Sequence, residues 1–257
     1  ELVAPGDYGL TGSFAAPVGS QIWGAMGIYK TTTWAEFSMT KSRAPVSEQG
    51  KSRFIHGAVY HALYDGPLAE ARSVVVDAVP ASSRVLDIAC GTGELCFDVA
   101  TRKDCQVVGV DLSPRMIEFA RKRNRQPKVQ FELGDGTDLA HLGPDSFDIA
   151  TILFLLHEIP REKQVLVLKE ALRLARRAIV VDSHVPLPKN LHGVALRVVE
   201  ASGGPSHYRP FADYLAAGGI GGILEDPRVR ASVAERWVFW HGCREMVALE
   251  RHAKTTG

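Results

Sequence analysis

The chain has 257 residues, of which 46% are hydrophobic, and its formal net charge is +1. This length suffices for one large α/β domain, or for one domain with appendages. The near-neutral charge gives no electrostatic reason to expect a nucleic-acid or membrane partner. The longest apolar run, residues 149–156, is too short to span a bilayer, and we expect no secretory leader.

The cysteines indicate a reducing compartment. The chain has four, and none shows the paired spacing of metal ligands: Cys90, Cys96, Cys105 and Cys243. We therefore expect free thiols, no metal site and a cytoplasmic location.

The N-terminal segment, residues 1–38, is rich in Gly, Ala, Ser and Thr and shows no clear period. It nevertheless carries several aromatic side chains: Phe14, Trp23, Tyr29, Trp34 and Phe37. We interpret residues 1–40 as a weakly ordered arm or extension. The alternative is an arm whose aromatic side chains pack on its own subunit or on a neighbouring one, and the second case would make a homodimer. The remaining residues, 41–257, then form one domain.

Two helices are expected between residues 50 and 80. The first spans residues 53–64 and is ended by Asp65-Gly66-Pro67. The second spans residues 68–79 and ends before Pro80.

From residue 84 onwards, short apolar runs alternate with amphipathic segments. The expected strands span residues 84–89, 106–110, 129–133, 147–155 and 178–182. The expected helices span residues 94–100, 113–124 and 161–175. This alternation predicts an α/β fold with a mostly parallel sheet and helices on both faces.

The C-terminal part is less regular. Helices are expected at residues 191–201 and 211–217, with Gly218-Gly219 and Gly221-Gly222 interrupting the second. Residues 233–240 and 244–249 then predict a terminal antiparallel hairpin.

The turn after the first strand carries the most specific motif, V-L-D-I-A-C-G-T-G. A dinucleotide fingerprint would need a third glycine where Cys96 stands. The spacing instead reads acidic-x-x-x-G-x-G, through Asp87, Gly91 and Gly93. Glycines at these positions allow a sharp turn and a close approach of the backbone to a ligand. The alternative is a plain glycine-rich turn.

Two further carboxylates follow strands of the predicted sheet. Asp111 ends the second strand, where it can accept hydrogen bonds from both hydroxyls of a ribose, or simply cap the next helix. Asp135 lies between Gly134 and Gly136 after the third strand. It can accept from an adenine amine, or belong to an ordinary Asp-Gly turn.

His157 and Glu158 come directly after the fourth strand, at the edge where open α/β sheets bind ligands. A zinc helix of the H-E-x-x-H type is excluded because Pro160 intervenes and Arg161 holds the fifth position. The imidazole is therefore either functional or structural, and not a ligand of such a zinc site.

Taken in order, these pieces resemble class I S-adenosylmethionine-dependent methyltransferases, closest to the ubiquinone/menaquinone-biosynthesis-like branch. The resemblance covers residues 84–185 through V-L-D-I-A-C-G-T-G, V-V-G-V-D-L-S-P-R-M-I-E-F-A, F-E-L-G-D-G and S-F-D-I-A-T-I-L-F-L-L-H-E-I-P. It implies a Rossmann-like sheet of seven strands whose last strand is antiparallel. It also implies a helical lid at 50–80, a substrate-side insertion at 186–232 and a terminal hairpin at 233–251.

The same resemblance assigns roles to individual residues. Gly91 and Gly93 would contact the methionyl part, and Asp87 would support the loop and the ammonium group. The other implied cofactor contacts are Asp111 for the ribose, Leu112 and Met116 flanking the adenine, Asp135 and Gly136 at its amine, Leu153 near the methyl group, and Tyr60 and Tyr64 as covering lid residues.

The implied reaction is methyl transfer from S-adenosylmethionine to a small molecule, for which the protein mainly aligns the acceptor and excludes water. His157 is the first candidate for a general base, and we expect burial to keep it neutral at the rim of a dry pocket. His207 and Tyr208, placed before a helix, are second candidates; for His207 the alternative is a surface loop. The alternatives in function are a methyltransferase-like protein that binds the cofactor without catalysis, and an NAD-dependent oxidoreductase.

Overall fold

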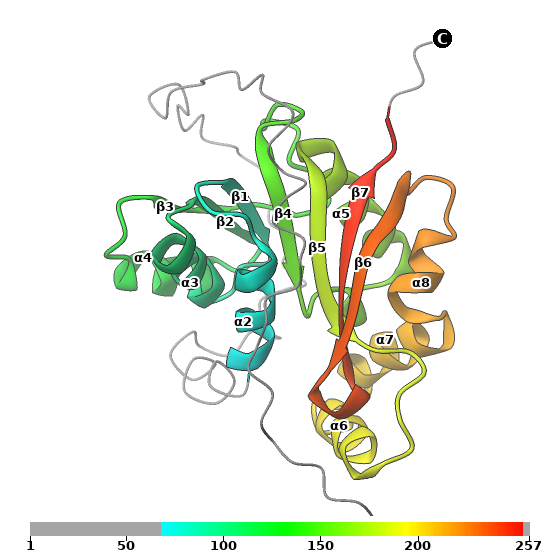
Figure 1. The fold of residues 1–257 in the computed structure, drawn as a ribbon. Helices are drawn as coiled ribbons and strands as arrows, with labels where there is room; N and C mark the ends of the chain where they lie inside the picture. Colours follow the sequence, from blue (N-terminus) through cyan, green and yellow to red (C-terminus); the bar gives the residue numbers. More distant parts are fainter. Residues whose placement is uncertain (1–67, 254–257) are drawn as a thin grey trace, which may run out of the picture. The chain divides into compact units, whose positions relative to one another are not determined.

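A single sheet organises residues 68–253, the part of the chain that the computed structural model describes (Figure 1). Its strand order is β3-β2-β1-β4-β5-β7-β6. The strands are β1 (Arg84–Ile88), β2 (Gln106–Asp111), β3 (Val129–Leu133), β4 (Phe147–Leu153), β5 (Ala175–Ser183), β6 (Ala231–Phe239) and β7 (Arg244–Arg251). Strands β1 to β5 are parallel, whereas β7 pairs antiparallel with both β5 and β6. The predicted sheet and terminal hairpin are confirmed.

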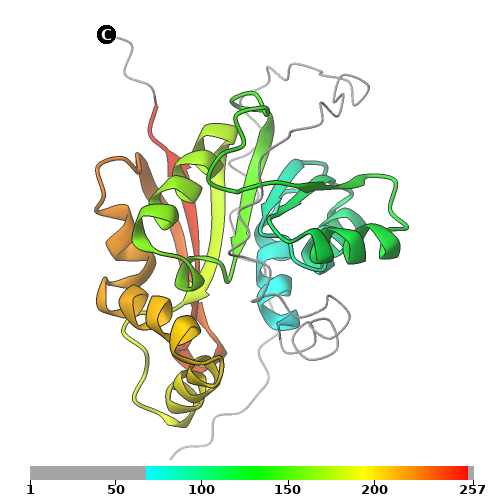
Figure 2. The ribbon, with the colours of Figure 1, turned by 180° about the vertical axis from the view of Figure 1, so that it is seen from behind.

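Helices cover both faces of this sheet. One face carries α2 (Ala69–Ala78), α3 (Glu94–Lys103) and α4 (Pro114–Arg123). The opposite face, seen in Figure 2, carries α5 (Arg161–Leu174) and α8 (Gly219–Leu224). Because both faces are covered, the central strands are nearly continuous apolar runs, as expected of a parallel sheet.

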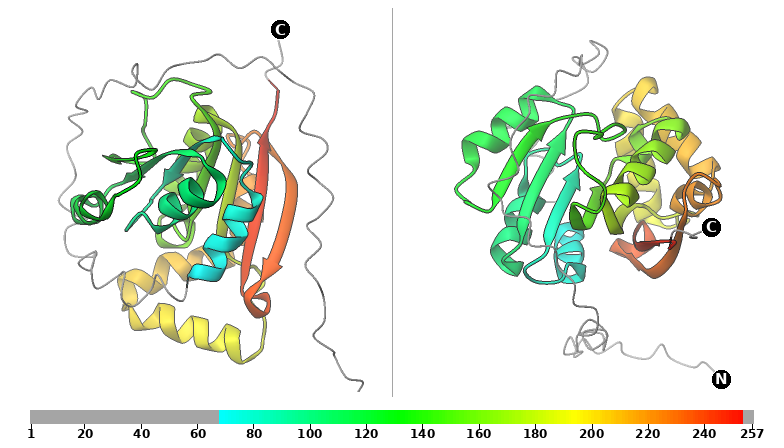
Figure 3. Two further views of the ribbon diagram at one scale, coloured as in Figure 1. Left: turned by 60° about the vertical axis from the view of Figure 1, so that its left-hand side comes forward. Right: turned by 90° about the horizontal axis from the view of Figure 1, so that it is seen from above.

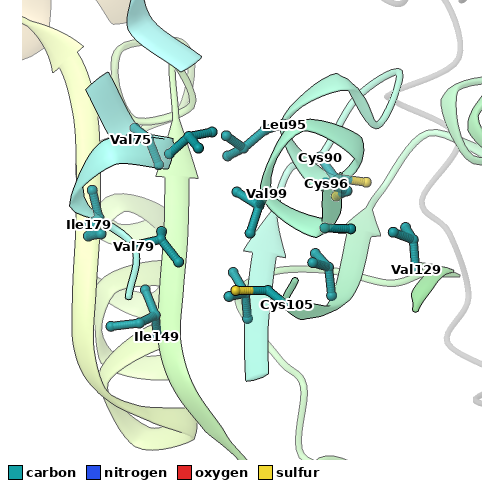
Figure 4. Close-up of a cluster of buried hydrophobic side chains, with 14 of the residues drawn as sticks. Val75, Val79, Cys90, Leu95, Cys96, Val99, Cys105, Val129, Ile149 and Ile179 are labelled. Atoms are coloured by element: carbon teal, nitrogen blue, oxygen red, sulfur yellow. The ribbon is translucent and has the colours of Figure 1, made fainter. Parts of the chain in front are cut away.

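The hydrophobic core on the α2–α3 face fixes how these helices lie on the sheet. Figure 4 shows Val75 of α2 and Leu95 and Val99 of α3 pointing toward the strand residues Ile149 and Ile179. All five are at most 5% exposed. Burying each such side chain contributes about 1.5–3 kcal/mol, so the core holds the turn between β1 and α3 in place.

Two more helices, α6 (Leu191–Ser202) and α7 (Pro205–Ala216), lie beyond the carboxyl end of β5 (Figure 3). They pack on each other, and α7 also packs on η4 (Leu156–Glu158), a single 3-10 turn that follows β4. Phe211 and Tyr214 of α7 are fully buried there. This packing brings α6 and α7 to the edge of the sheet where β4 and β5 end.

Several predicted boundaries in this part of the chain were wrong. The helix expected at 211–217 begins at Pro205, whose fixed φ suits a first helical position. Of the four glycines expected to interrupt it, Gly218, with a φ of +83°, does separate the two helices, whereas Gly219, Gly221 and Gly222 lie within α8. Strand β5 starts at Ala175, directly after α5, rather than at Ala178.

Some predictions fall on residues outside the described range: the arm at 1–40, the helix at 53–64, and Tyr60 and Tyr64. Within residues 68–253, no helix is long and apolar enough to cross a membrane. The four cysteines there are free and buried.

Candidate functional site

The carboxyl ends of β1, β2 and β3 form the first part of the site, which we call the glycine-turn edge: Gly91, Gly93, Asp111 and Asp135. Because these strands are parallel neighbours, the residues that follow them meet at one edge of the sheet. The strands that carry these residues are the ones that the sequence predicted, and the role of the residues toward a cofactor stays a prediction.

The two glycines of the turn have left-handed backbone conformations, with φ of +54° at Gly91 and +83° at Gly93. A Cβ on Gly93 would lie 2.5 Å from the ring of Phe131, so that position has no room for a side chain. A Cβ on Gly91 would meet nothing within 4 Å. The backbone at Gly91 therefore borders open space, into which a ligand can lie against the main chain.

Asp111 binds the glycine turn directly. The N–H of Gly91 donates to Oδ2 at 2.9 Å, and the N–H of Ser113 donates to Oδ1 at 2.8 Å. Burial raises the pKa of this carboxyl, and the two N–H donors oppose the rise. The cap of α4 is Ser113, whose hydroxyl accepts from the N–H of Met116, so the simple capping alternative for Asp111 is wrong. Each Asp111 oxygen retains acceptor capacity, which suits the two hydroxyls of a ribose.

Asp87 is the penultimate residue of β1, just before the glycine turn, and its side chain is buried, with 3% exposed. Its carboxylate accepts from Oγ1 of Thr151 at 2.7 Å and from the thiol of Cys96 at 3.3 Å. Burial raises its pKa to about 7, against the effect of these two donors. The group therefore gains its negative charge in the neutral pH range, beneath the glycine turn.

The turn after β3 supports both interpretations of Asp135. Its Oδ1 accepts from the N–H and the hydroxyl of Thr137 at 2.9 and 2.7 Å, as in an ordinary Asx turn. A Cβ on Gly136 would lie 2.5 Å from Cγ2 of Ile88, so the turn is held close to the end of β1. The role of Asp135 and Gly136 toward an adenine stays a prediction.

The three apolar residues predicted at this edge differ in exposure. Met116 is 4% exposed, whereas Leu112 and Leu153 are partly exposed. Leu112 and Leu153 therefore retain surface that a bound ligand could cover, and Met116 retains little.

A second group of polar side chains lies beyond β4 and β5, which we call the carboxylate–histidine cluster: His157, Asp182, Glu200 and His207. Nδ1 of His157 lies 2.7 Å from Oδ1 of Asp182, and the two residues are 4% and 0% exposed. Oδ2 of Asp182 accepts from the N–H of Leu156 at 3.0 Å, which fixes the carboxylate under η4.

The expectation that burial keeps His157 neutral was wrong. Burial does lower its pKa, but the charge of Asp182, helped by Glu158 and Glu200, raises it to about 9. The residue therefore carries a proton at neutral pH in this arrangement. The expectation failed because it considered only the apolar neighbours of His157 in sequence and not Asp182.

His207 and Tyr208 lie inside α7, not before it, so the predicted loop position is wrong. Nε2 of His207 is 3.0 Å from Oε2 of Glu200, which ties α7 to α6. Oε1 of the same Glu200 is 3.9 Å from Nε2 of His157. Tyr208 packs its ring on Phe211, with centroids 5.9 Å apart. The structure thus brings His207 near His157 through Glu200.

Asp182 and Glu200 were missed by the sequence reasoning, although each had a signal. Asp182 is the penultimate residue of β5, the strand next to β4, and the same-edge argument that selected Asp111 applies to it. Glu200 follows Leu196 by four residues and so lies on the buried face of an amphipathic helix. A carboxylate there is costly unless it has a partner.

Comparisons with known proteins agree with this architecture. Residues 85–178 match the family described as "Methyltransferase domain". The 27-O-demethylrifamycin SV methyltransferase of Amycolatopsis mediterranei is 35% identical over 134 residues, 48% of this chain and 47% of that protein. The demethylmenaquinone methyltransferase of Lactobacillus johnsonii is 36% identical over 104 residues, 38% of this chain and 41% of that protein.

These alignments span less than half of each curated relative. Among solved structures, an S-adenosylmethionine-dependent methyltransferase from Aquifex aeolicus superposes with a TM-score of 0.56 at 16% identity. That match covers 77% of this chain and 100% of the other, and at this identity it shows the fold alone.

Proposed function

We propose that this chain, which carries a class I methyltransferase domain, transfers a methyl group from S-adenosylmethionine to a hydroxyl group of a small molecule. The observation that supports the hydroxyl as acceptor is the pair formed by His157 and Asp182. It lies beyond β4 and β5, at the same sheet edge as the glycine turn. A hydroxyl needs a base when it attacks, and this pair can supply one.

The glycine-turn edge suits the cofactor. Asp111 offers acceptors to a ribose, the open space at Gly91 admits the methionyl part, and Asp87 provides a negative charge beneath the turn. When bound, S-adenosylmethionine supplies an already activated methyl group. The remaining work of the protein is to hold the acceptor in line and to exclude water.

His157 can act as the base through Nε2. Asp182 accepts a hydrogen bond from Nδ1–H, which leaves the lone pair of the neutral imidazole on Nε2. The same carboxylate stabilises the imidazolium that forms when Nε2 takes the proton of the acceptor hydroxyl. The roles of His157 and Asp182 are therefore proton transfer and orientation, respectively.

The test is a screen of small hydroxylated molecules that follows formation of S-adenosylhomocysteine, paired with calorimetry of cofactor binding. We expect micromolar binding of S-adenosylmethionine or S-adenosylhomocysteine, no measurable binding of NAD, and turnover of at least one hydroxylated acceptor. Binding without turnover across the screen would favour a cofactor-binding protein without catalysis. Saturable binding of NAD alone would contradict the proposal.

We further propose a cytoplasmic location, which the four free thiols support. We also propose that the chain forms a homodimer through residues 1–40. The near-neutral charge supports a small molecule rather than nucleic acid as the acceptor. Light scattering of the full chain and of a chain lacking residues 1–40 tests the dimer. A monomer in both would contradict it.

A further inference from the structure

The gap between His157 and Glu200 is the starting point. Nε2 of His157 and Oε1 of Glu200 are 3.9 Å apart, which is too far for a direct hydrogen bond. The other oxygen of Glu200, Oε2, is held by Nε2 of His207 at 3.0 Å. Glu200 is only 6% exposed, so its carboxylate is fixed in place facing the proposed base.

When His157 is neutral and can act as a base, the groups on both sides of this gap are hydrogen-bond acceptors. Neutral His157 keeps its proton on Nδ1, against Asp182, and presents only a lone pair at Nε2. An ionised carboxylate accepts hydrogen bonds and donates none. A single hydroxyl has one proton and can satisfy one of the two groups. A molecule that satisfies both must bring two neighbouring donors.

We propose that Glu200 orients the methyl acceptor and selects molecules in which a second hydrogen-bond donor neighbours the reacting hydroxyl, as in a catechol. This inference rests on the proposed function. The reacting hydroxyl gives its proton to Nε2 of His157, and its oxygen lone pair forms the new bond to the methyl carbon. The bond between that carbon and sulfur breaks, and its electron pair stays on sulfur. The second donor keeps its proton and holds the molecule against Oε1 of Glu200.

The surrounding charges favour donors over an anionic acceptor. The negative charges of Asp182, Glu158 and Glu200 all raise the pKa of His157. Glu158 remains in contact with solvent, although desolvation by the surrounding protein atoms raises the pKa of its own carboxyl. Arg244, a partly buried cation whose charge acts on Asp182, already donates to Oγ of Ser183 at 2.7 Å and lies 4.7 Å above the ring of Phe154. His207 is engaged by Glu200 itself.

The test measures binding without methyl transfer. Protein saturated with S-adenosylhomocysteine and labelled with ¹⁵N-histidine is titrated with catechol and, separately, with phenol, under reducing conditions. The titrations are run at pH 9.5, above the pKa of about 9 of His157, so that the neutral imidazole is the main form. The reporter is the His157 resonance, assigned from its absence in His157→Asn. We expect catechol to bind about tenfold to a hundredfold more tightly than phenol, the range expected for one hydrogen bond to a charged group.

Two variants assign this preference. Glu200→Ala is expected to bring the affinity for catechol down to that for phenol, with the affinity for phenol unchanged within about twofold. Glu200→Gln keeps the size of the side chain and one neutral acceptor, so it should show an intermediate preference for catechol. If the alanine variant does not fold, the glutamine variant tests whether Glu200 causes the preference. Glu118→Gln, on the exposed face of α4, is the matched control and should behave as the unmodified chain.

Each other outcome overturns the inference. Equal affinity for catechol and phenol in the unmodified chain would show that no second donor is selected, and so would failure of both to bind at millimolar concentration. A catechol preference that persists in both Glu200 variants would show that another group selects it. If the unmodified chain does not bind S-adenosylhomocysteine, the proposed function itself fails. This outcome is distinguishable because binding of S-adenosylhomocysteine is measured before either probe is added.

Discussion

The glycine-turn edge and the carboxylate–histidine cluster lie at the same carboxyl edge of the sheet but are built in different ways. At the glycine-turn edge, a backbone N–H of the turn, at Gly91, meets the carboxylate that ends the next strand, Asp111. In the cluster, side chains from four separate elements meet one another: η4, β5, α6 and α7. A site built from local backbone shape tolerates little change in its own few residues. A site built from side chains depends on how distant elements pack.

The largest expected effect tests the cluster through His157→Asn. The asparagine amide can donate to Asp182 where Nδ1 did, but it offers no base at the position of Nε2. We expect turnover to fall by about a hundredfold to ten-thousandfold, the range for loss of a general base, with cofactor affinity nearly unchanged. Turnover is measured with an acceptor from the screen, and affinity by calorimetry.

The asparagine variant is preferable to His157→Ala because the latter leaves the buried charge of Asp182 without its side-chain partner. A fall in affinity together with turnover would make His157 a structural residue of both regions. If neither changes, the base lies elsewhere, and His207 is the next residue to replace.

The next effect, on the other region, is that of Asp111→Ala. It removes the acceptor of the N–H groups of Gly91 and Ser113, and in the proposed role of Asp111 it also removes a charged acceptor from the two ribose hydroxyls. Since a hydrogen bond to a charged group is worth about 1.5–3 kcal/mol, cofactor affinity should fall roughly tenfold to a hundredfold. Calorimetry with S-adenosylhomocysteine measures it. An unchanged dissociation constant would rule out the ribose role.

The contrast between the regions also explains what the sequence could predict. The position of Gly91, Gly93 and Asp111 follows from strand period, glycine conformation and the parallel order of strands, all of which are local or topological. The protonation of His157 could not be predicted in the same way. It depends on Asp182, which lies on another strand, and on Glu200, whose helix α6 packs on α7. The rings of Phe211 and Tyr214 in α7 in turn contact the imidazole of His157.

The helix boundaries near residues 205–224 failed for a related reason. Glycines at 218, 219, 221 and 222 have poor helix propensity, and they predict a break. In the fold, however, a Cβ on Gly222 would lie 1.7 Å from the carbonyl oxygen of Ala217, so the close approach of α7 and α8 requires glycine within a helix. Tertiary contact outweighs propensity here.

The pH dependence of turnover gives a third, smaller effect that belongs to the cluster. The pKa of His157 is raised to about 9, so the neutral form that acts as a base is the minor form below that pH. Turnover should therefore rise with pH, by roughly tenfold per unit, and level off near pH 9. Glu200→Gln removes one of the charges that raise this pKa, so the rise should shift to lower pH. A rate that is flat from pH 6 to 9 would show that His157 does not accept the proton.

The smallest expected effect tests whether the glycine-turn edge titrates independently of the cluster. The pKa of Asp87 is raised to about 7 by burial, so this carboxyl is mostly neutral at pH 5.5 and mostly ionised at pH 7.5. In the proposed role of Asp87, the ionised form would attract the ammonium group of the cofactor, and an interaction of about 1 kcal/mol corresponds to roughly fivefold in affinity. Affinity for S-adenosylhomocysteine, measured by calorimetry, should therefore rise by this factor from pH 5.5 to 7.5.

In Asp87→Asn the amide oxygen can still accept from Thr151, but the charge is gone, and the rise should disappear. If the variant keeps the same rise, another group controls it, and if the unmodified chain shows none, Asp87 acts only through its hydrogen bonds to Thr151 and Cys96. Because this change is centred near pH 7 and that of turnover near pH 9, the two regions can be separated in one set of titrations.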